Sequence, residues 1–183
     1  MTSRSTVRVL AFVIVGLLSS AAGEAQERRG VVFVHAGGAS IGHADSEMGT
    51  VPVFGGGAAV HLTPRIVLDG DVHGGRVTGV FGREHHDFTP ITFTVSVLFR
   101  SAPDGRTHVI GGGGYGVQRA HTTFTVEPFG LTDRVETVGL LHGRAGVEWD
   151  LSDRVMLRTE GVIWFGGGLD WVTGAQAAVG YRF

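Results

Sequence analysis

The sequence predicts an all-β fold, an eight-stranded antiparallel up-and-down transmembrane β-barrel. Three observations lead to this prediction: an N-terminal export signal, segments of about ten residues in which apolar and polar side chains alternate, and a regular alternation of short and long connections between those segments.

The first 25 residues have the three parts of a secretory signal peptide. Arg4 and Arg8 provide the positive region, the run from Val9 to Leu18 is apolar, and Gly23 and Ala25 are the small residues before a cleavage site. An uncleaved anchor is the alternative, but the apolar run is too short to span a bilayer comfortably. We therefore expect residues 1–25 to be a cleaved signal peptide and residues 26–183 to form a single outer-membrane barrel domain.

Composition excludes several classes of protein. The chain has no cysteine, so it has neither a lipid-anchoring cysteine nor a disulfide framework. Its formal net charge is −2, and removal of the signal peptide takes away two Arg and one Glu, which leaves the remainder weakly acidic. A weakly acidic chain lacks the basic patch that nucleic-acid binding requires, so we expect no nucleic-acid partner.

After residue 30 the helical period is absent and a period of two replaces it. Segments of about ten residues have the length that a tilted strand needs to cross a bilayer. The eight predicted strands are residues 31–40, 53–62, 66–76, 89–100, 107–119, 138–150, 155–165 and 173–183.

The connections alternate in length without exception. Residues 63–65, 102–105 and 152–154 are tight turns rich in Pro, Asp and Gly. The longer connections are residues 41–52, 77–88, 120–137 and 166–172. Short periplasmic turns and longer external loops are typical of outer-membrane barrels, and an even number of strands places both termini on the periplasmic side.

The turns also predict strand registers. A three-residue loop at 152–154 pairs Trp149 with Leu157 and sets Glu148 opposite Arg158. The apolar and the charged side chains of this hairpin then fall on opposite faces. The hairpin at 63–65 likewise separates apolar from polar side chains. One face carries Val60, Leu62, Ile66 and Leu68, and the other carries His61, Asp69 and Asp71.

The patterning indicates which face meets lipid. In residues 91–100 one face carries Ile91, Phe93, Val95, Val97 and Phe99, and the other is largely Thr and Ser. Aromatic residues gather near the predicted strand ends, as in the girdles of transmembrane barrels. They are Trp149, Phe99, Tyr181 and Phe183 at the turn end, and Trp164, Phe165 and Trp171 at the loop end. A soluble barrel with its apolar face inward is the alternative.

The last predicted strand, residues 173–183, ends on Phe183 and carries Tyr181, Val179, Ala177 and Ala175 on the same face. This ending resembles the C-terminal targeting signal of outer-membrane barrels, and the chain is similar to the outer-membrane protein β-barrel domain family with its OmpA-, OmpX- and OmpW-type members. The resemblance implies location in the bacterial outer membrane, contact with outer-membrane lipids, and a monomer. It also implies an assembly signal at Tyr181 and Phe183 that the barrel-assembly machinery reads.

Charged side chains on the inward face form the candidate site. They are Asp69, Asp71, Arg144, Glu148, Asp150, Arg158, Glu160 and Arg182. One interpretation is that this set forms a functional cluster. The interpretation we favour is a buried ion network, because eight strands leave an interior that side chains fill and buried charges must be paired. Two pairs fit this interpretation: Glu148 opposite Arg158, and Arg144 diagonal to Glu160.

No motif predicts a metal, a cofactor or an enzyme. None of the nine histidines has the spacing of a zinc site, and His85 and His86 lie in a predicted loop. Residues 111–114 are four glycines without the Lys-Ser/Thr of a phosphate-binding loop, so we read them as a bend in a strand. A lipid A deacylase needs a Ser beside a His, but only Gly143 and Arg144 follow His142, and Ser96 and Thr94 read as polar filling.

Three function classes remain after these exclusions. The preferred one is a structural or interaction barrel, closed by paired charges, with external loops such as 121–136 available to partners. The first alternative is a narrow channel for small or hydrophobic solutes, as the OmpW-type resemblance implies. Small lumen residues favour it: Gly55, Gly57, Ala59, Gly112 and Gly114. A lipid A-modifying enzyme is the second alternative.

Overall fold

The structure is a computed structural model that describes residues 30–43, 46–81, 84–101, 105–126, 130–166 and 169–183. The predicted signal peptide, residues 1–25, lies outside these described residues. Within the described ranges, no helix is long and apolar enough to cross a membrane.

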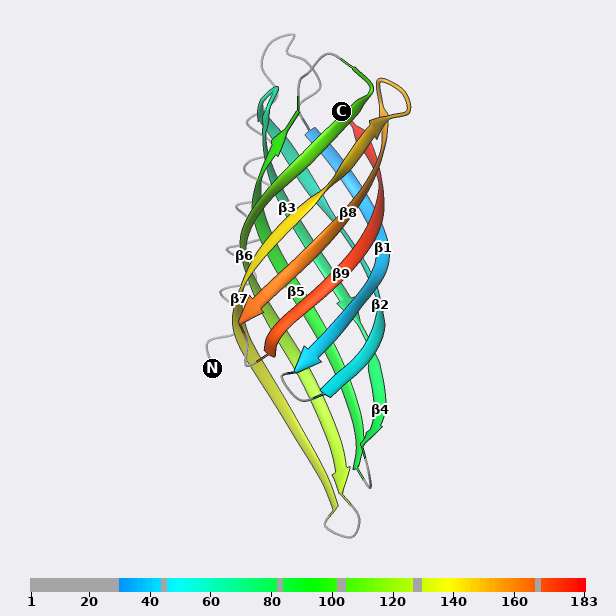
Figure 1. Cartoon of the computed structure of the whole chain (residues 1–183), viewed down its shortest axis with the longest axis vertical. Coiled ribbons are helices and arrows are strands. Elements are labelled where there is room, and N and C mark those ends of the chain that lie inside the picture. The colour runs from blue at the N-terminus through cyan, green and yellow to red at the C-terminus, as the bar shows by residue number, and fades with distance from the viewer. Residues whose placement is uncertain (1–29, 44–45, 82–83, 102–104, 127–129, 167–168) are drawn as a thin grey trace.

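Nine strands make up the described chain (Figure 1). They are β1 (Gly30–His43), β2 (Ser46–Thr63), β3 (Ile66–Gly75), β4 (Val77–Phe81), β5 (Glu84–Arg100), β6 (Thr107–Val126), β7 (Gly130–Asp150), β8 (Val155–Gly166) and β9 (Leu169–Arg182). β4 continues the course of β3 after a break at Arg76. The barrel wall therefore has eight strands, as the sequence predicted.

Pairing between the first and last strands closes the sheet. β1 pairs antiparallel with β9 from Val31–Arg182 to Gly42–Trp171, and β3 pairs with β5, so the strand order runs round a complete ring. Backbone hydrogen bonds also join Gly30 to Phe183. A closed antiparallel ring pairs the backbone groups that lipid cannot hydrogen-bond, which is the requirement for crossing a bilayer with strands.

The registers predicted from the turns are confirmed. Glu148 pairs with Arg158 and Trp149 with Leu157 across β7 and β8. Between β2 and β3, Val60 pairs with Leu68, and the register shifts by one residue next to the turn at Pro64. A one-residue slip would have exchanged the two faces of either hairpin, so the apolar pattern fixes the pairing.

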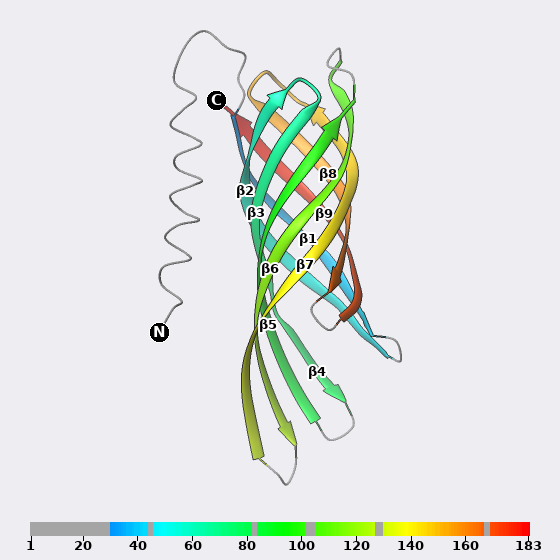
Figure 2. The same ribbon diagram turned by 90° about the vertical axis from the view of Figure 1, so that its left-hand side faces the viewer.

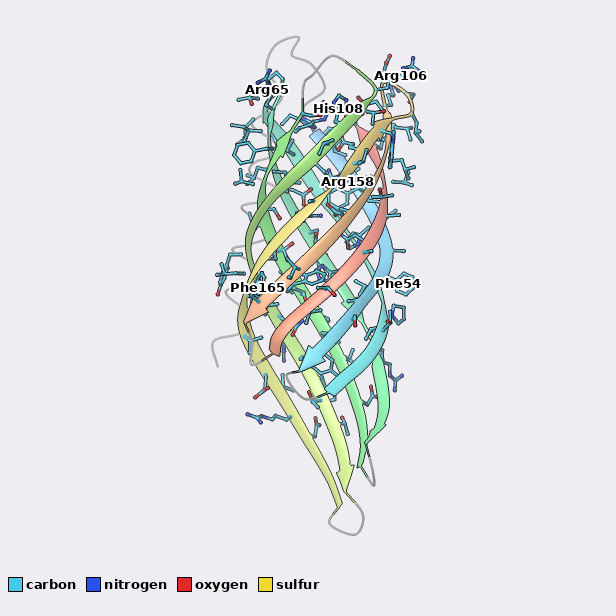
Figure 3. The ribbon with its side chains drawn as sticks, in the orientation of Figure 1. Phe54, Arg65, Arg106, His108, Arg158 and Phe165 are labelled. Atoms are coloured by element: carbon cyan, nitrogen blue, oxygen red, sulfur yellow. The ribbon has the colours of Figure 1, made fainter. Side chains whose placement is uncertain are left out.

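The apolar face lies outside the barrel. On β5 the large outward side chains are 41–63% exposed: Ile91, Phe93, Val95, Val97 and Phe99. The alternate residues Thr92, Thr94 and Ser96 are buried in the lumen. Phe54 and Phe165 project away from the wall in Figure 3. An apolar exterior around a polar interior is the arrangement of a transmembrane barrel, the reverse of a soluble one.

The aromatic girdle is partly as predicted. Phe99, Tyr181 and Phe183 face outward at the end of the barrel that carries the short turns, and Phe165 faces outward at the other end. Trp164, predicted to lie in the girdle, is 7% exposed and points into the lumen. Neighbouring residues of a strand point to opposite faces, so Trp164 and Phe165 do not both reach the lipid. Trp171 was the third aromatic residue predicted for the girdle at the loop end, and its side chain lies outside the described part of the structure.

The predicted long connections are wrong in their extent, because most of their residues belong to strands. β4 and the start of β5 occupy much of 77–88, and β6 and β7 run through 120–126 and 130–137. These strands extend beyond the rim of the barrel (Figure 2). The prediction limited each strand to the thickness of a bilayer, but hairpin pairing continues past the membrane where the chain is rich in Thr and Val, residues that favour strands.

The small lumen residues do not leave open space. A side chain at Gly112 or Gly114 would collide with carbonyl oxygens of β5, so these glycines allow close approach of two strands. A Cβ atom at Gly57 would lie 2.8 Å from the ring of Phe33, and Ala59 packs in a buried apolar cluster. The channel alternative therefore loses the observation that supported it.

The outward apolar band gives a stability prediction. Val95 lies near the middle of the barrel part of β5, so Val95→Arg places a charge in the bilayer and is expected to lower the free energy of unfolding by about 2–4 kcal/mol. Urea unfolding in lipid vesicles measures the change. Thr137→Arg, on the exposed part of β7 beyond the rim, is the matched control and is expected to change little. Equal losses in both variants would contradict the placement of the band.

Candidate functional site: the lumen

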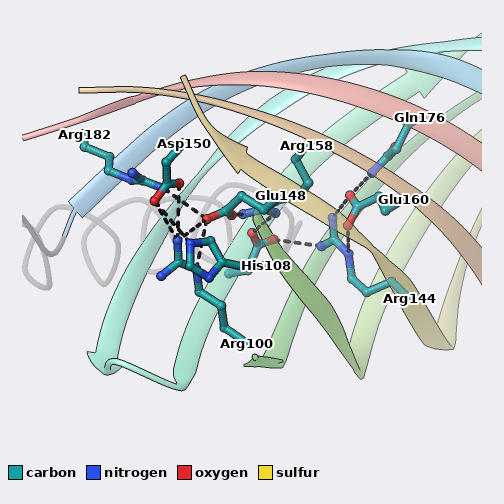
Figure 4. A network of polar contacts seen from close by, with 10 residues as sticks. Arg100, His108, Arg144, Glu148, Asp150, Arg158, Glu160, Gln176 and Arg182 are labelled. Carbon is teal, nitrogen blue, oxygen red and sulfur yellow. Dashed lines mark hydrogen bonds and ion pairs between the residues drawn. The ribbon is translucent and has the colours of Figure 1, made fainter. Parts of the chain in front are cut away.

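The structure brings all eight predicted charged residues together inside the barrel. Asp69 and Asp71 come from β3, Arg144, Glu148 and Asp150 from β7, Arg158 and Glu160 from β8, and Arg182 from β9. Their side chains reach one another across the lumen, and most are joined in the network of Figure 4. Alternation alone placed them on the inward face, and closure of the ring makes them meet.

The middle of the lumen is held by two guanidinium groups around one carboxylate. Arg144 donates to Oδ1 of Asp69 at 2.8 Å, and Arg158 donates to Oδ2 at 2.9 Å. Arg144 also donates through Nε to Glu160 at 3.0 Å, and Gln176 donates to the same carboxylate at 2.6 Å. The diagonal contact between Arg144 and Glu160 expected from the sequence is therefore present.

A second part of the network lies nearer the short turns. Arg100 donates to Glu148 and to Asp150, each at 3.1 Å, and Arg182 donates to the same two carboxylates. His108 lies 3.3 Å from Asp150. The predicted set did not include Arg100, although the alternation of residues 91–100 places it on the inward face.

The lumen is filled as well as charged. Five carboxylates (Asp69, Asp71, Glu148, Asp150 and Glu160) meet four guanidinium groups (Arg100, Arg144, Arg158 and Arg182). An apolar cluster that includes Val31, Phe33 and Met156 packs toward the end with the short turns, and Leu140, Val162 and Trp164 pack toward the opposite end. The guanidinium carbon of Arg158 lies 5.3 Å from the ring centroid of Phe33.

Next to Asp71 the structure assembles a group that sequence spacing missed. His35 on β1 and Asp71 and His73 on β3 each offer a metal-ligating atom, and these atoms all lie within 4.8 Å of one another. The sequence predicted no metal site because none of its histidines has the linear spacing of a zinc site. The sequence contains one signal of this site: Asp71 and His73 are two residues apart, so they share one face of a strand. The third residue, His35, comes from a distant part of the chain, and its approach could not be predicted from spacing.

A serine and a histidine also meet in the lumen. Oγ of Ser96 lies 2.7 Å from Nε2 of His142, and both residues are buried. Arg144 donates to the same Oγ at 3.3 Å. Among the described residues, Nδ1 of His142 has no hydrogen-bond partner, so no carboxylate orients the ring as a catalytic triad requires.

A small cavity lies among lumen residues beyond the ion network. A cavity of about 50 Å³ lies toward the end opposite the short turns, with His73, Thr92, Gln118, Leu140 and Trp164 among its lining residues. It has room for a water molecule or an ion. It borders the group formed by His35, Asp71 and His73.

The network predicts a large effect of removing one charge. Asp69→Asn leaves Arg144 and Arg158 without their shared carboxylate, and the loss of a buried partner costs about 3–5 kcal/mol of unfolding free energy. Urea unfolding of the refolded barrel measures it. Asp87→Asn, which breaks the exposed pair with Arg76, is the control and is expected to have a small effect. Equal effects of the two substitutions would show that the lumen pairs are solvated.

No protein-family model matches the sequence, and no curated protein matches it. Solved structures do match. Neisserial surface protein A has a TM-score of 0.70 at 14% identity, over 84% of this chain and 97% of that one. The attachment invasion locus protein Ail of Yersinia pestis has a TM-score of 0.65 at 14% identity, over 86% and 100%.

A major outer membrane protein from Thermus thermophilus matches with a TM-score of 0.55 at 13% identity, over 84% of this chain and 99% of that one. At these identities the matches show the fold alone. The fold predicted from the sequence is confirmed: this chain has the closed eight-stranded antiparallel barrel of the small outer-membrane proteins of bacteria.

Proposed function

We propose that the chain is an outer-membrane barrel that is closed to solutes and that presents a projecting sheet to partners outside the cell. The projecting sheet consists of β4 and the parts of β5, β6 and β7 beyond the rim, residues 77–81, 84–90, 120–126 and 130–139. The proposal rests on one observation: the same barrel has a lumen filled by side chains and a sheet that extends beyond its rim.

The outward band of apolar side chains supports insertion in a membrane. The short turns and the two ends of the barrel chain lie together at one end, and the projecting sheet lies at the other (Figure 1). In outer-membrane barrels the short turns are periplasmic, so the sheet extends into the medium. Tyr181 and Phe183 then stand at the periplasmic end of β9, where they serve as the signal for the barrel-assembly machinery.

The lumen network supports a closed barrel. Its ion pairs reach from β3 across to β7 and β8, and from β5 and β9 to β7, so charged side chains occupy the cross-section at two levels. Opening a path for solutes would require these pairs to separate, and each unpaired buried charge is strongly unfavourable. A constitutive channel is therefore the weaker candidate.

The projecting sheet supports an interaction role. Residues 130–139 of β7 pair only with β6 within the described chain, because β8 begins its pairing with β7 at Leu140. A free strand edge binds partners by adding a strand, and exposed charges limit unwanted pairing. Val135 is exposed between Arg134 and Glu136, which form an ion pair. The names of two structural matches describe surface exposure and attachment, which favours the same role here.

A catalytic role receives less support. Ser96 and His142 lie inside the lumen among ion pairs, where the acyl chains of membrane lipids do not reach. The hydroxyl of Ser96 accepts from Arg144 and the histidine lacks an orienting acid among the described residues, so neither group is prepared for nucleophilic attack. We propose that the barrel is not an enzyme.

Conductance tests the closed lumen. The purified barrel in a planar lipid bilayer is expected to show no steady unitary current, because the ion network fills the lumen. The double variant Arg144→Ala and Arg158→Ala removes the two central guanidinium groups and is expected to admit ions if it folds. A steady current through the unmodified barrel would instead establish the channel alternative.

Thiol labelling tests the orientation. The chain has no cysteine, so a single introduced thiol is the only site of reaction. Val135→Cys, on the projecting sheet, is expected to react with a membrane-impermeant maleimide on intact cells. Arg65→Cys, in a short turn (Figure 3), is expected to react only after the outer membrane is permeabilised. The opposite labelling pattern would reverse the proposed orientation.

A further inference from the structure

His35 is a buried polar side chain without a partner. It is 5% exposed, and neither ring nitrogen has a hydrogen-bond partner among the described residues. A neutral imidazole carries one donor and one acceptor, and both are costly to bury unsatisfied. The burial of His35 in the lumen therefore indicates that an ion or a water molecule contacts its ring nitrogens in the functional protein.

The groups facing His35 are metal-binding groups. The ring centroid of His73 lies 5.9 Å from that of His35 in an edge-on arrangement. Nδ1 of His73 lies 2.9 Å from Oδ1 of Asp71, to which it donates. One ligating atom from each of the three residues falls within 4.8 Å of the others. A tetrahedral ion with ligand bonds of about 2.0–2.1 Å needs donor atoms about 3.3 Å apart, which small side-chain rotations supply.

We propose that His35, Asp71 and His73 bind one divalent transition-metal ion, with zinc as the best fit. Two imidazoles and one carboxylate suit zinc and copper and do not suit magnesium or calcium, which take oxygen ligands. On binding, the ion takes the place of the proton between Nδ1 of His73 and Asp71, and the neutral imidazole then carries its single proton on Nε2. Three protein ligands leave a fourth position open.

The charges around the site favour a cation. The lumen network holds five carboxylates against four guanidinium groups, so one negative charge is in excess. Asp71 has the weakest guanidinium contact of the five, a distance of 3.5 Å to Arg144. Its other partner is His73. Asp71 is therefore the carboxylate with most capacity left for a metal ion.

The surrounding structure leaves room for the His35 ring and a path by which the ion can reach the site. A Cβ atom at Gly55 would lie 2.6 Å from Nε2 of His35, so a glycine on β2 allows the ring to take this position. His73 also lines the small cavity beside Trp164, toward the projecting sheet, which gives the ion an approach from outside the cell. Bound metal would tie β1 to β3, strands that are separated in the wall by β2.

Titration calorimetry with zinc tests the proposal on the full chain expressed in cells and purified from membranes in detergent. One zinc ion per barrel is expected to bind, and it is expected to raise the temperature at which the folded barrel loses its fast gel mobility. Copper in the same site is expected to show nitrogen couplings from two imidazoles by electron paramagnetic resonance. Failure of the folded barrel to bind zinc stoichiometrically overturns the proposal.

Substitutions locate the ion. His35→Phe and His73→Gln are each expected to weaken zinc binding by at least about a hundredfold, beyond the loss that indirect partners of a metal cause. His61→Gln, a lumen histidine near the short turns, and His121→Gln, whose ring lies against Asp133 on the projecting sheet, are controls expected to retain binding. Binding that survives in the first two variants, or that is lost in His121→Gln, places the ion elsewhere and overturns the proposal.

Discussion

The pairing of β1 with β9 closes the described sheet into a ring, and a ring of eight strands is narrow. Lipid offers no hydrogen bonds, so the backbone must be satisfied by neighbouring strands, and closure achieves this without a free edge in the barrel wall. The same closure separates two surfaces with opposite chemistry. The outer surface must be apolar, and the inner one must be filled by side chains, since eight strands leave no wider space.

Charged side chains fill this space by pairing across it. Arg144 reaches from β7 to Asp69 on β3, and Arg158 reaches the same carboxylate from β8. Each buried charge would be unfavourable alone, and the shared carboxylate compensates both guanidinium groups. Because strands far apart in the wall are joined in this way, the network braces the barrel as well as filling its lumen.

The sequence predicted what depends on neighbours along the chain or across a turn. Alternation assigned the faces, and the turn at 152–154 fixed the pairing of Glu148 with Arg158. Contacts across the lumen were not predictable in this way, because the meeting of His35 with Asp71 depends on how the closed ring staggers its strands. The side chain of Trp164 was misplaced because a tryptophan at a strand end suggested the lipid interface, whereas alternation places it inside.

Strand β7 links the two regions on which the proposed function depends. It carries Arg144 in the lumen and Glu136 in the projecting sheet, and its pairing with β6 continues without a register shift from Trp149 to Gly130. A change of register in the sheet would therefore require Arg144 to leave its partners in the lumen, because one slip turns inward residues outward. The lumen network thus holds the projecting sheet in a fixed register, so the proposed partner would meet a constant strand edge.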